Sequence, residues 1–149
     1  MNEIDERLLR RAIELALAAR AAGQRPYGSL LAGPGGAVLA EEHNTVLADA
    51  DITAHPELKL ARWAARSLDP GTASATTLYT SCEPCEMCRG AIARAGIGRV
   101  VFALSDARWR ALVPPDVVAS HDDAAAYEGP ALDCVADGPV AGYYPEAPA

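Results

Sequence analysis

The residues best suited to chemistry lie in two short stretches, HPE at 55–57 and PCEMC at 84–88. Cys85 and Cys88 stand at the expected start of a helix, where both thiols can bind one ion from the same face. A helix N-terminus also lowers the pKa of a thiol, which favours the thiolate form that binds metals. His55 is the best third ligand, because two thiolates and a neutral imidazole balance the charge of Zn²⁺ and leave a fourth tetrahedral position open.

Glu57 follows His55 on the same expected helical turn, beside the open metal position and not itself a ligand. A carboxylate there can take a proton from activated water and pass it to a leaving group. Three protein ligands with one open position are typical of catalytic zinc sites, whereas structural sites are closed by four ligands. The spacing H-x-E followed by P-C-x-x-C is typical of zinc deaminases, and the chain matches it at every position.

Two other interpretations of the cysteines stay open at this point. The C-x-x-C pair could be a redox pair of the thioredoxin type, although no thioredoxin-like context surrounds it. A structural zinc site would need a fourth ligand, which Cys82 could supply in principle. Cys82 precedes Cys85, and Pro84 between them is expected to turn it aside.

Composition indicates one soluble domain. The chain has 149 residues, half of them hydrophobic, and no apolar run approaches the roughly 18 residues needed to cross a bilayer. Residues 1–11 are charged and lack the apolar stretch of a signal peptide, and four cysteines are too few for a disulfide framework, so we expect a cytoplasmic protein. The net charge of −7 and the scattered basic residues argue against nucleic-acid binding.

Hydrophobic periodicity predicts helices and strands in alternation, which is typical of α/β proteins. A helical crossover between successive strands implies that those strands pair in parallel, and an antiparallel hairpin at the beginning makes the sheet mixed. After Leu104 the pattern weakens, and we expect one further strand near Leu132–Val135 and a loose terminus. The other expected elements are a helix over Asn2–Ala22, hairpin strands over Pro26–Ala32 and Ala37–Glu42, a loop over His43–Thr53, a helix from His55 to about Leu68, a strand over Thr76–Thr80, a helix from Pro84 to Gly96 and a buried strand over Arg99–Leu104.

Three further stretches match one family. PYGSLL at 26–31 is similar to a PFGA strand, DITAH at 51–55 is similar to a DPTAH motif, and TLYTSCEPC at 77–85 is closest to guanine deaminases. With these residues, the chain resembles the cytidine deaminase-like superfamily, in the branch of guanine deaminases, yeast-type cytosine deaminases and tRNA adenosine deaminases. The resemblance covers about Arg7–Asp106. It implies a three-layer α/β/α fold with a five-stranded mixed sheet, one zinc-dependent deaminase domain over residues 1–149, and usually a homodimer.

The same resemblance implies hydrolytic deamination of a small nucleobase or nucleoside, guanine-like first and cytosine-like next. Zinc is the implied cofactor; activated water attacks the carbon bearing the exocyclic amine, Glu57 shuttles protons, and ammonia leaves. Carried over by position, the substrate-binding candidates are Asn44 as a hydrogen-bonding group, Tyr27 and Cys82 in the pocket wall, the backbone N–H groups of Ala54 and Cys85, and Asp106 at the rim.

Two features depart from the family pattern. Pro56 stands where the family most often has alanine or glycine, although proline suits the first position of a helix because its missing N–H needs no partner there. From Trp109 on, the sequence lacks the recognisable helix with which many relatives close the pocket. The alternatives are a tRNA adenosine deaminase, which the acidic charge opposes, and a non-catalytic zinc-stabilised binding protein, which the unligated Glu57 opposes.

Overall fold

The structure is a computed structural model that describes residues 1–122, 125–128, 131, 135, 137 and 139–144. It divides into two parts, Met1–Pro114 and Pro115–Ala149. The second part contains the short helix α7 (Pro115–Ala119). Most of the strand predicted over Leu132–Val135 falls outside the described residues. In the part of the chain that the structure describes, no helix is long and apolar enough to span a bilayer.

Met1–Pro114 is built on a mixed sheet of strand order β2-β1-β3-β4. β1 pairs antiparallel with β2, and β3 pairs parallel with β4, as the sequence predicts. The prediction that the helical crossover before β3 pairs it in parallel with β2 is wrong, because β1 lies between these strands and pairs antiparallel with β3. The prediction of five strands is wrong for the described residues, in which the sheet has four strands. The strands are β1 (Gly28–Ala32), β2 (Val38–His43), β3 (Thr77–Cys82) and β4 (Arg99–Leu104).

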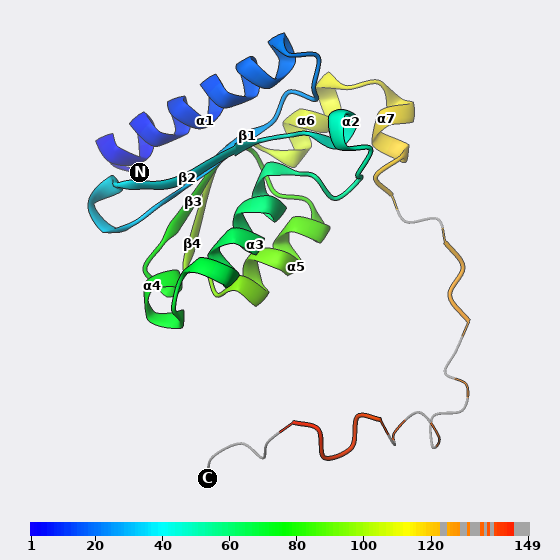
Figure 1. Cartoon of the computed structure of the whole chain (residues 1–149). Helices are drawn as coiled ribbons and strands as arrows, with labels where there is room; N and C mark the ends of the chain where they lie inside the picture. The colour runs from blue at the N-terminus through cyan, green and yellow to red at the C-terminus, as the bar shows by residue number, and fades with distance from the viewer. Residues whose placement is uncertain (123–124, 129–130, 132–134, 136, 138, 145–149) are drawn as a thin grey trace. The chain divides into compact units, whose positions relative to one another are not determined.

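Helices cover both faces of this sheet, which confirms the three-layer α/β/α arrangement (Figure 1). α1 (Glu3–Ala21) lies on one face, and α3 (Pro56–Ser67) and α5 (Glu86–Ala95) lie side by side on the other. The shorter helices are η1 (Pro34–Gly36), α2 (Val46–Asp49), α4 (Pro70–Ser74) and α6 (Asp106–Leu112).

α4 and α6 are not predicted from the sequence, because the polar residue that caps each helix is also typical of a turn. The Asp69 carboxylate accepts the Thr72 N–H, so the residues that end α3 also start α4. The Ser105 hydroxyl accepts the Arg108 N–H at the start of α6. Trp109, from which residue on the sequence shows no recognisable pocket-closing helix, therefore lies inside the short helix α6.

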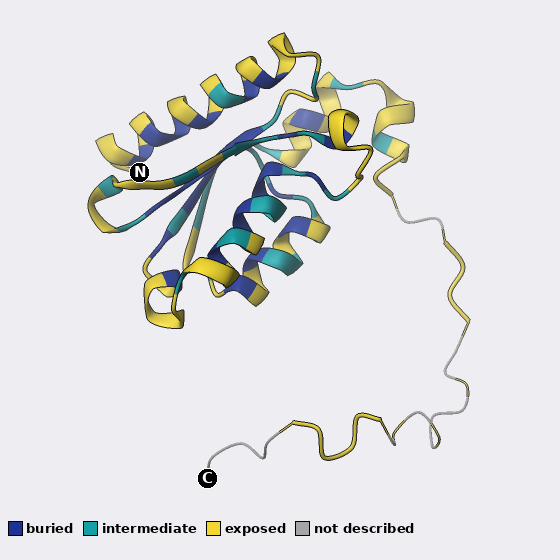
Figure 2. Cartoon of the chain, viewed as in Figure 1, coloured by how far each residue is buried: buried dark blue, intermediate teal, exposed yellow. Residues whose placement is uncertain are grey.

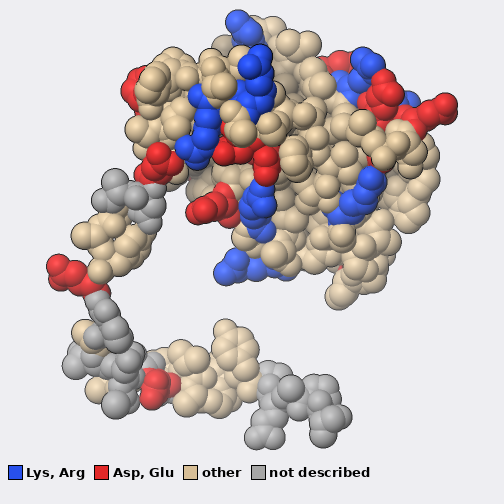
Figure 3. Space-filling model, turned by 180° about the vertical axis from the view of Figure 1, so that it is seen from behind, with Lys and Arg blue, Asp and Glu red and all other residues tan. Residues whose placement is uncertain are grey.

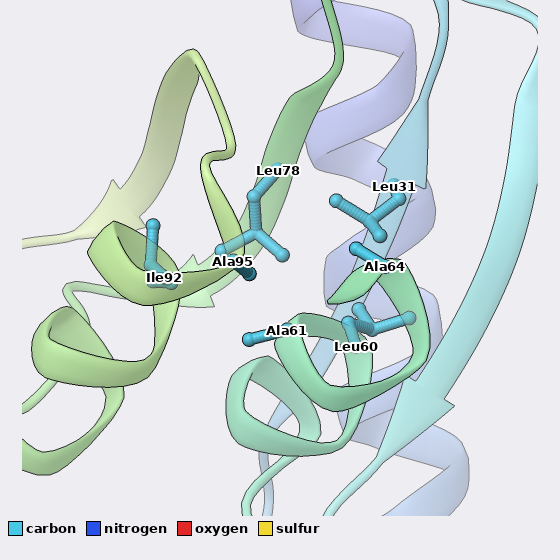
Figure 4. Close-up of a cluster of buried hydrophobic side chains, with 7 residues drawn as sticks. All are labelled: Leu31, Leu60, Ala61, Ala64, Leu78, Ile92 and Ala95. Atoms are coloured by element: carbon cyan, nitrogen blue, oxygen red, sulfur yellow. The ribbon is translucent and has the colours of Figure 1, made fainter. Parts of the chain in front are cut away.

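The core lies on both faces of β1 (Figure 2). Successive side chains of a strand point to opposite faces, so Leu30 packs towards α1 and Leu31 packs towards α3 and α5. Every residue of β1 is buried as a result, which explains why Ser29 is its one polar residue. Figure 4 shows the cluster under α3 and α5, which consists of Leu31, Leu60, Ala61, Ala64, Leu78, Ile92 and Ala95.

β4 corrects one prediction from the sequence. Its apolar run predicted a buried strand, but none of its residues is fully buried, and the Phe102 side chain is 40% exposed. The reason is its position, because β4 is the last strand of the sheet that the described residues form. An apolar run alone does not distinguish a central strand from an edge strand.

A buried acidic residue connects α1 to the sheet. Asp5 is 1% exposed, and its Oδ1 accepts hydrogen bonds from the Tyr79 hydroxyl at 2.7 Å and from Arg99 Nη1 at 2.8 Å. Its Oδ2 accepts Arg99 Nη2 at 2.9 Å, so the guanidinium binds both carboxylate oxygens. These bonds join the first turn of α1 to β3 and β4. Burial of Asp5 requires both partners, since an unpaired buried carboxylate is strongly unfavourable.

Replacing Gly28 by alanine should destabilise the fold. A Cβ at this position would lie 2.5 Å from the Ala16 backbone nitrogen and 2.7 Å from the Ala12 carbonyl oxygen, so α1 would have to move away from β1. We expect Gly28→Ala to lower the free energy of unfolding by about 1–3 kcal/mol or more, measured by urea denaturation. Gly33→Ala is the matched control, because its nearest neighbouring atom would be 3.9 Å away and its φ is −77°. Equal losses in the two variants would contradict this packing argument.

Replacing Asp5 by asparagine should make stability less dependent on acidic pH. The hydrogen bonds from Arg99 and Tyr79 hold the pKa of Asp5 well below its ordinary value of 3.8. A carboxyl with a lowered pKa stabilises the folded state fully above its ordinary pKa, and this contribution is lost as the pH falls below 3.8. At pH 7 we expect Asp5→Asn to lower the melting temperature by several degrees, and the difference from wild type to shrink as the pH falls below that value. A difference that stays constant between pH 7 and pH 3 would contradict the expectation.

Candidate active site

The three predicted metal ligands meet where the N-termini of α3 and α5 come together. His55 is the N-cap of α3, and Cys85 is the N-cap of α5. Cys88 lies one turn into α5 and is fully buried. His55 Nδ1 lies 3.7 Å from Cys85 Sγ and 3.6 Å from Cys88 Sγ, and the three atoms all lie within 4.8 Å of one another.

Local sequence explains why these ligands point to a common centre. Pro56 occupies the first position of α3, where the backbone of His55 is still extended with a ψ of 143°. The proline therefore fixes where α3 begins, and so the backbone position from which the His55 side chain extends. Small residues then let the two helices approach closely, since Ala61 and Ala64 of α3 share one cluster with Ala95 of α5.

The donor set fits a zinc ion. At ordinary zinc–nitrogen and zinc–sulfur bond lengths, an imidazole nitrogen and a thiolate sulfur on one tetrahedral ion are about 3.6 Å apart. The two observed distances from His55 Nδ1, 3.7 Å and 3.6 Å, are those of such an edge. Among the described residues Cys82 is not part of this cluster, so the alternative of a closed site with four ligands has no support in the geometry.

The electrostatics of the two thiols also favour binding of a cation. The hydrogen bonds with Cys88 and His55 lower the pKa of Cys85 to about 4. The hydrogen bond to Cys85, together with burial, raises the pKa of Cys88. Two neighbouring thiols share one proton in this way because a second negative charge is unfavourable beside the first. A divalent cation removes this penalty and allows both sulfurs to be thiolates.

Glu57 lies against the ligand cluster with only 5% of its surface exposed. Its Oε1 accepts a hydrogen bond of 2.6 Å from the Thr80 hydroxyl, while its Oε2 lies 3.8 Å from Cys88 Sγ. Burial raises the pKa of the Glu57 carboxyl, and the bond from Thr80 offsets part of this rise. One oxygen is thus anchored in the protein, and the other faces the ligands.

Tyr27 and Cys82 lie near Glu57, as expected for pocket residues. Burial raises the pKa of both groups, that of Cys82 to about 11, and the charge of Glu57 adds to each rise. The Tyr27 hydroxyl accepts a hydrogen bond of 2.7 Å from the indole N–H of Trp109, which is itself buried. α6 therefore reaches Tyr27 through Trp109, a residue with no predicted role in the site.

Asn44 is 1% exposed and has a fixed orientation. Its Oδ1 accepts the Val46 N–H at 3.0 Å, and its own N–H donates to the Tyr27 carbonyl. With the amide oxygen engaged, the side-chain NH₂ is the group that Asn44 can offer to a ligand. Among the described residues no partner is found for this NH₂, and the substrate-binding role of Asn44 stays a prediction.

The remaining candidates differ in what they can offer. The Ala54 N–H already donates to the Asp51 carbonyl at 3.0 Å, so it is engaged within the protein. Asp106 is at the surface, where its carboxylate pairs with Arg110 at 2.8 Å. The Cys85 N–H donates no hydrogen bond within the described residues, which leaves it available.

Sequence reasoning did not assign Thr80 or its neighbour Ser29. Both are fully buried, and the Ser29 hydroxyl donates to Thr80 Oγ1 at 2.8 Å. The one signal in the sequence is that Ser29 is the polar residue of an otherwise apolar strand, whereas Thr80 has polar neighbours in its own strand. That signal does not reveal the partner, because the partner depends on how β1 and β3 align.

Comparison with known proteins agrees with this geometry. Residues 2–104 match the family model of the cytidine and deoxycytidylate deaminase zinc-binding region. The chain belongs to this family. His55, Cys85 and Cys88 are thus the residues that can bind the zinc of the family's zinc-binding region.

Relatives with different names share this region. The chain is 37% identical to a tRNA-specific adenosine deaminase of Haemophilus influenzae over 74% of its length, and 38% identical to a probable cytosine deaminase of Schizosaccharomyces pombe over 71%. It spans 64% of each of these two relatives, somewhat less than two thirds. The crystal structure of guanine deaminase from Bacillus subtilis has the same fold, with a TM-score of 0.72 and 29% identity over 100% of this chain and 99% of that one.

Removing one thiolate should abolish metal binding. We expect about one zinc per chain in the purified protein, and loss of nearly all of it in Cys85→Ala, because two ligands do not hold zinc against dialysis. Metal analysis by mass spectrometry measures this. Cys82→Ala is the matched control, since Cys82 lies outside the ligand cluster, and it should retain its zinc. Retention of zinc in Cys85→Ala, or its loss in Cys82→Ala, would show that the ligand set is wrong.

Proposed function

We propose that this chain is a zinc-dependent hydrolytic deaminase that releases ammonia from a small aminated nucleobase or nucleoside. The observation that carries the proposal is the position of Glu57. It is a buried carboxylate that touches a ligand of the metal cluster but is not part of that cluster. A structural zinc site has no need of such a group, because burying a carboxylate is unfavourable and this one adds no ligand.

The chain's own residues can carry the proton transfers. Zinc in a site with three protein ligands supplies Lewis-acid activation of water. Oε2 of Glu57 faces the cluster and can accept a proton from the attacking water, then deliver it to the departing amino group. A carbon–oxygen bond forms, the carbon–nitrogen bond breaks, and ammonia leaves. Asn44 orients the substrate by donating its NH₂ protons to an acceptor on the ring.

A guanine-like base is the favoured substrate, followed by a cytosine-like base. The support is the guanine deaminase of B. subtilis, which matches this chain over nearly the full length of both proteins. Tyr27 and Trp109 are two aromatic residues joined by a hydrogen bond near Glu57, and aromatic side chains suit a planar heterocycle. The donor that Asn44 offers fits a ring carbonyl, which guanine and cytosine have and adenine lacks.

A tRNA substrate is the second candidate, because a tRNA-specific adenosine deaminase is among the relatives. Charge disfavours it. The chain has 13 Lys and Arg against 20 Asp and Glu, and on the face in Figure 3 the two signs are interspersed. Binding to a phosphate backbone depends on several cationic contacts.

Ammonia release from guanine, cytosine, adenine, their nucleosides and a tRNA anticodon stem-loop tests the proposal. We expect the highest kcat/KM with guanine. Activity on the stem-loop alone would establish the second candidate instead. Absence of ammonia release from every compound by the zinc-loaded protein would favour a non-catalytic binding protein.

Glu57→Gln should abolish activity and leave the metal in place. The amide has nearly the same shape as the carboxylate but cannot accept the proton, and general acid–base groups contribute about 10²- to 10⁴-fold to rates. We expect a loss of that size in kcat on the best substrate, with the zinc content of wild type. An active Glu57→Gln variant with full zinc would refute the mechanism.

A further inference from the structure

A chain of two hydroxyl groups leads from the interior of the sheet to Glu57. The Ser29 hydroxyl donates to Thr80 Oγ1 at 2.8 Å, and the Thr80 hydroxyl donates to Glu57 Oε1 at 2.6 Å. Ser29 and Thr80 are directly opposite each other in the pairing of β1 with β3, and both are 0% exposed. Neither residue belongs to the metal cluster or is a predicted pocket residue.

The direction of these hydrogen bonds is fixed by chemistry. When Glu57 is ionised, as a proton acceptor must be, its carboxylate can only accept, so the Thr80 proton points to Glu57 Oε1. The Thr80 oxygen is then left with its lone pairs, and the Ser29 proton points to one of them. Each bond in such a chain polarises and strengthens the next. The chain therefore has one arrangement of protons and one orientation of the carboxylate.

Ser29 and Thr80 are polar residues beside an apolar core. The next residues on the same face are Leu31 and Leu78, which are also paired across β1 and β3 and belong to the apolar core. An apolar pair at Ser29 and Thr80 would continue that core. Two buried hydroxyls are instead placed under the carboxylate that faces the metal ligands.

We propose that Thr80, supported by Ser29, is a positioning residue that holds the Glu57 carboxylate so that Oε2 faces the metal cluster. Anchoring Oε1 from below prevents rotation of the carboxylate plane, and this rotation would carry Oε2 away from the cluster. The inference rests on the proposed deaminase function and deepens it. Thr80 acts on the reaction through Glu57, and Ser29 acts through Thr80.

Removal of the Thr80 hydroxyl tests the first step. Thr80→Val has nearly the same shape but no donor, and we expect kcat to fall about 10- to 100-fold, since small displacements of a catalytic group have effects of this size. KM and zinc content should stay close to the wild-type values, because neither substrate nor metal contacts Thr80. Thr80→Ser restores the donor and should keep kcat within a few fold of wild type.

Thr76→Val is the matched control for the loss of a buried hydroxyl. Thr76 is 1% exposed and directly precedes β3, and its hydroxyl donates to the Ala73 carbonyl instead of to a site residue. We expect this variant to lose stability but to keep kcat. An equal fall of kcat in Thr76→Val and Thr80→Val, or a normal kcat in Thr80→Val, would overturn the proposal.

A double-mutant cycle tests the role of Ser29. Ser29→Ala should lower kcat by a few fold in the wild-type background, because Thr80 loses the donor that orients it. In the Thr80→Val background the same change should leave kcat unaffected, since Ser29 has lost its route to Glu57. The same fall in both backgrounds would show that Ser29 does not act through Thr80.

Crystal structures of zinc-loaded wild type and Thr80→Val separate this proposal from the proposed function. If wild type releases no ammonia from any compound, the deaminase assignment fails, but the orientation of Glu57 can still be compared. A carboxylate that rotates or becomes disordered in Thr80→Val supports positioning by Thr80. An unchanged carboxylate in both proteins overturns it, whatever the activity.

Discussion

The site depends on one constraint: the N-termini of two neighbouring helices must lie close enough for a single metal ion to bind ligands from both. His55, Cys85 and Cys88 come from α3 and α5, and their ligand atoms lie within 4.8 Å of one another. α3 and α5 both pack on the sheet, which fixes their position above it, and small residues between the two helices set the distance between them. Helix N-termini also carry partial positive charge, which stabilises the thiolates and the nearby carboxylate. The same arrangement therefore supplies both the geometry and the electrostatics.

The sheet has a second role beyond supporting the helices. On the face towards α3 and α5, β1 and β3 are apolar at Leu31 and Leu78 and polar at Ser29 and Thr80. The polar end of this face contacts Glu57, a buried carboxylate that lies against the metal ligands but is not one of them. On the opposite face, Tyr79 bonds Asp5 and so fixes α1. β3 thus combines core packing with a polar contact to a helix on each face of the sheet.

The sequence predicts some of these features and not others, for a physical reason. The ligands and Glu57 are predictable because they form two short patterns, His55 with Glu57 and Cys85 with Cys88, each with a spacing within one helix turn that can be read from the sequence. The contacts Ser29–Thr80, Tyr79–Asp5 and Tyr27–Trp109 join distant segments, so they depend on strand register and helix placement. The edge position of β4 is of the same kind, since it depends on the strand order and not on the residues of β4.

On the proposed function, this division also separates catalysis from substrate choice. The metal ligands and Glu57 are fixed by α3, α5 and the sheet, all of which are packed into the core. Tyr27, just before β1, and Trp109 of α6, which follows the edge strand, would then form a wall of the substrate site. A change in α6 could reshape that wall without moving the metal cluster. Tyr27 can be proposed from its position in the sequence, but its contact with Trp109 cannot, because these two residues meet only after the whole sheet has formed.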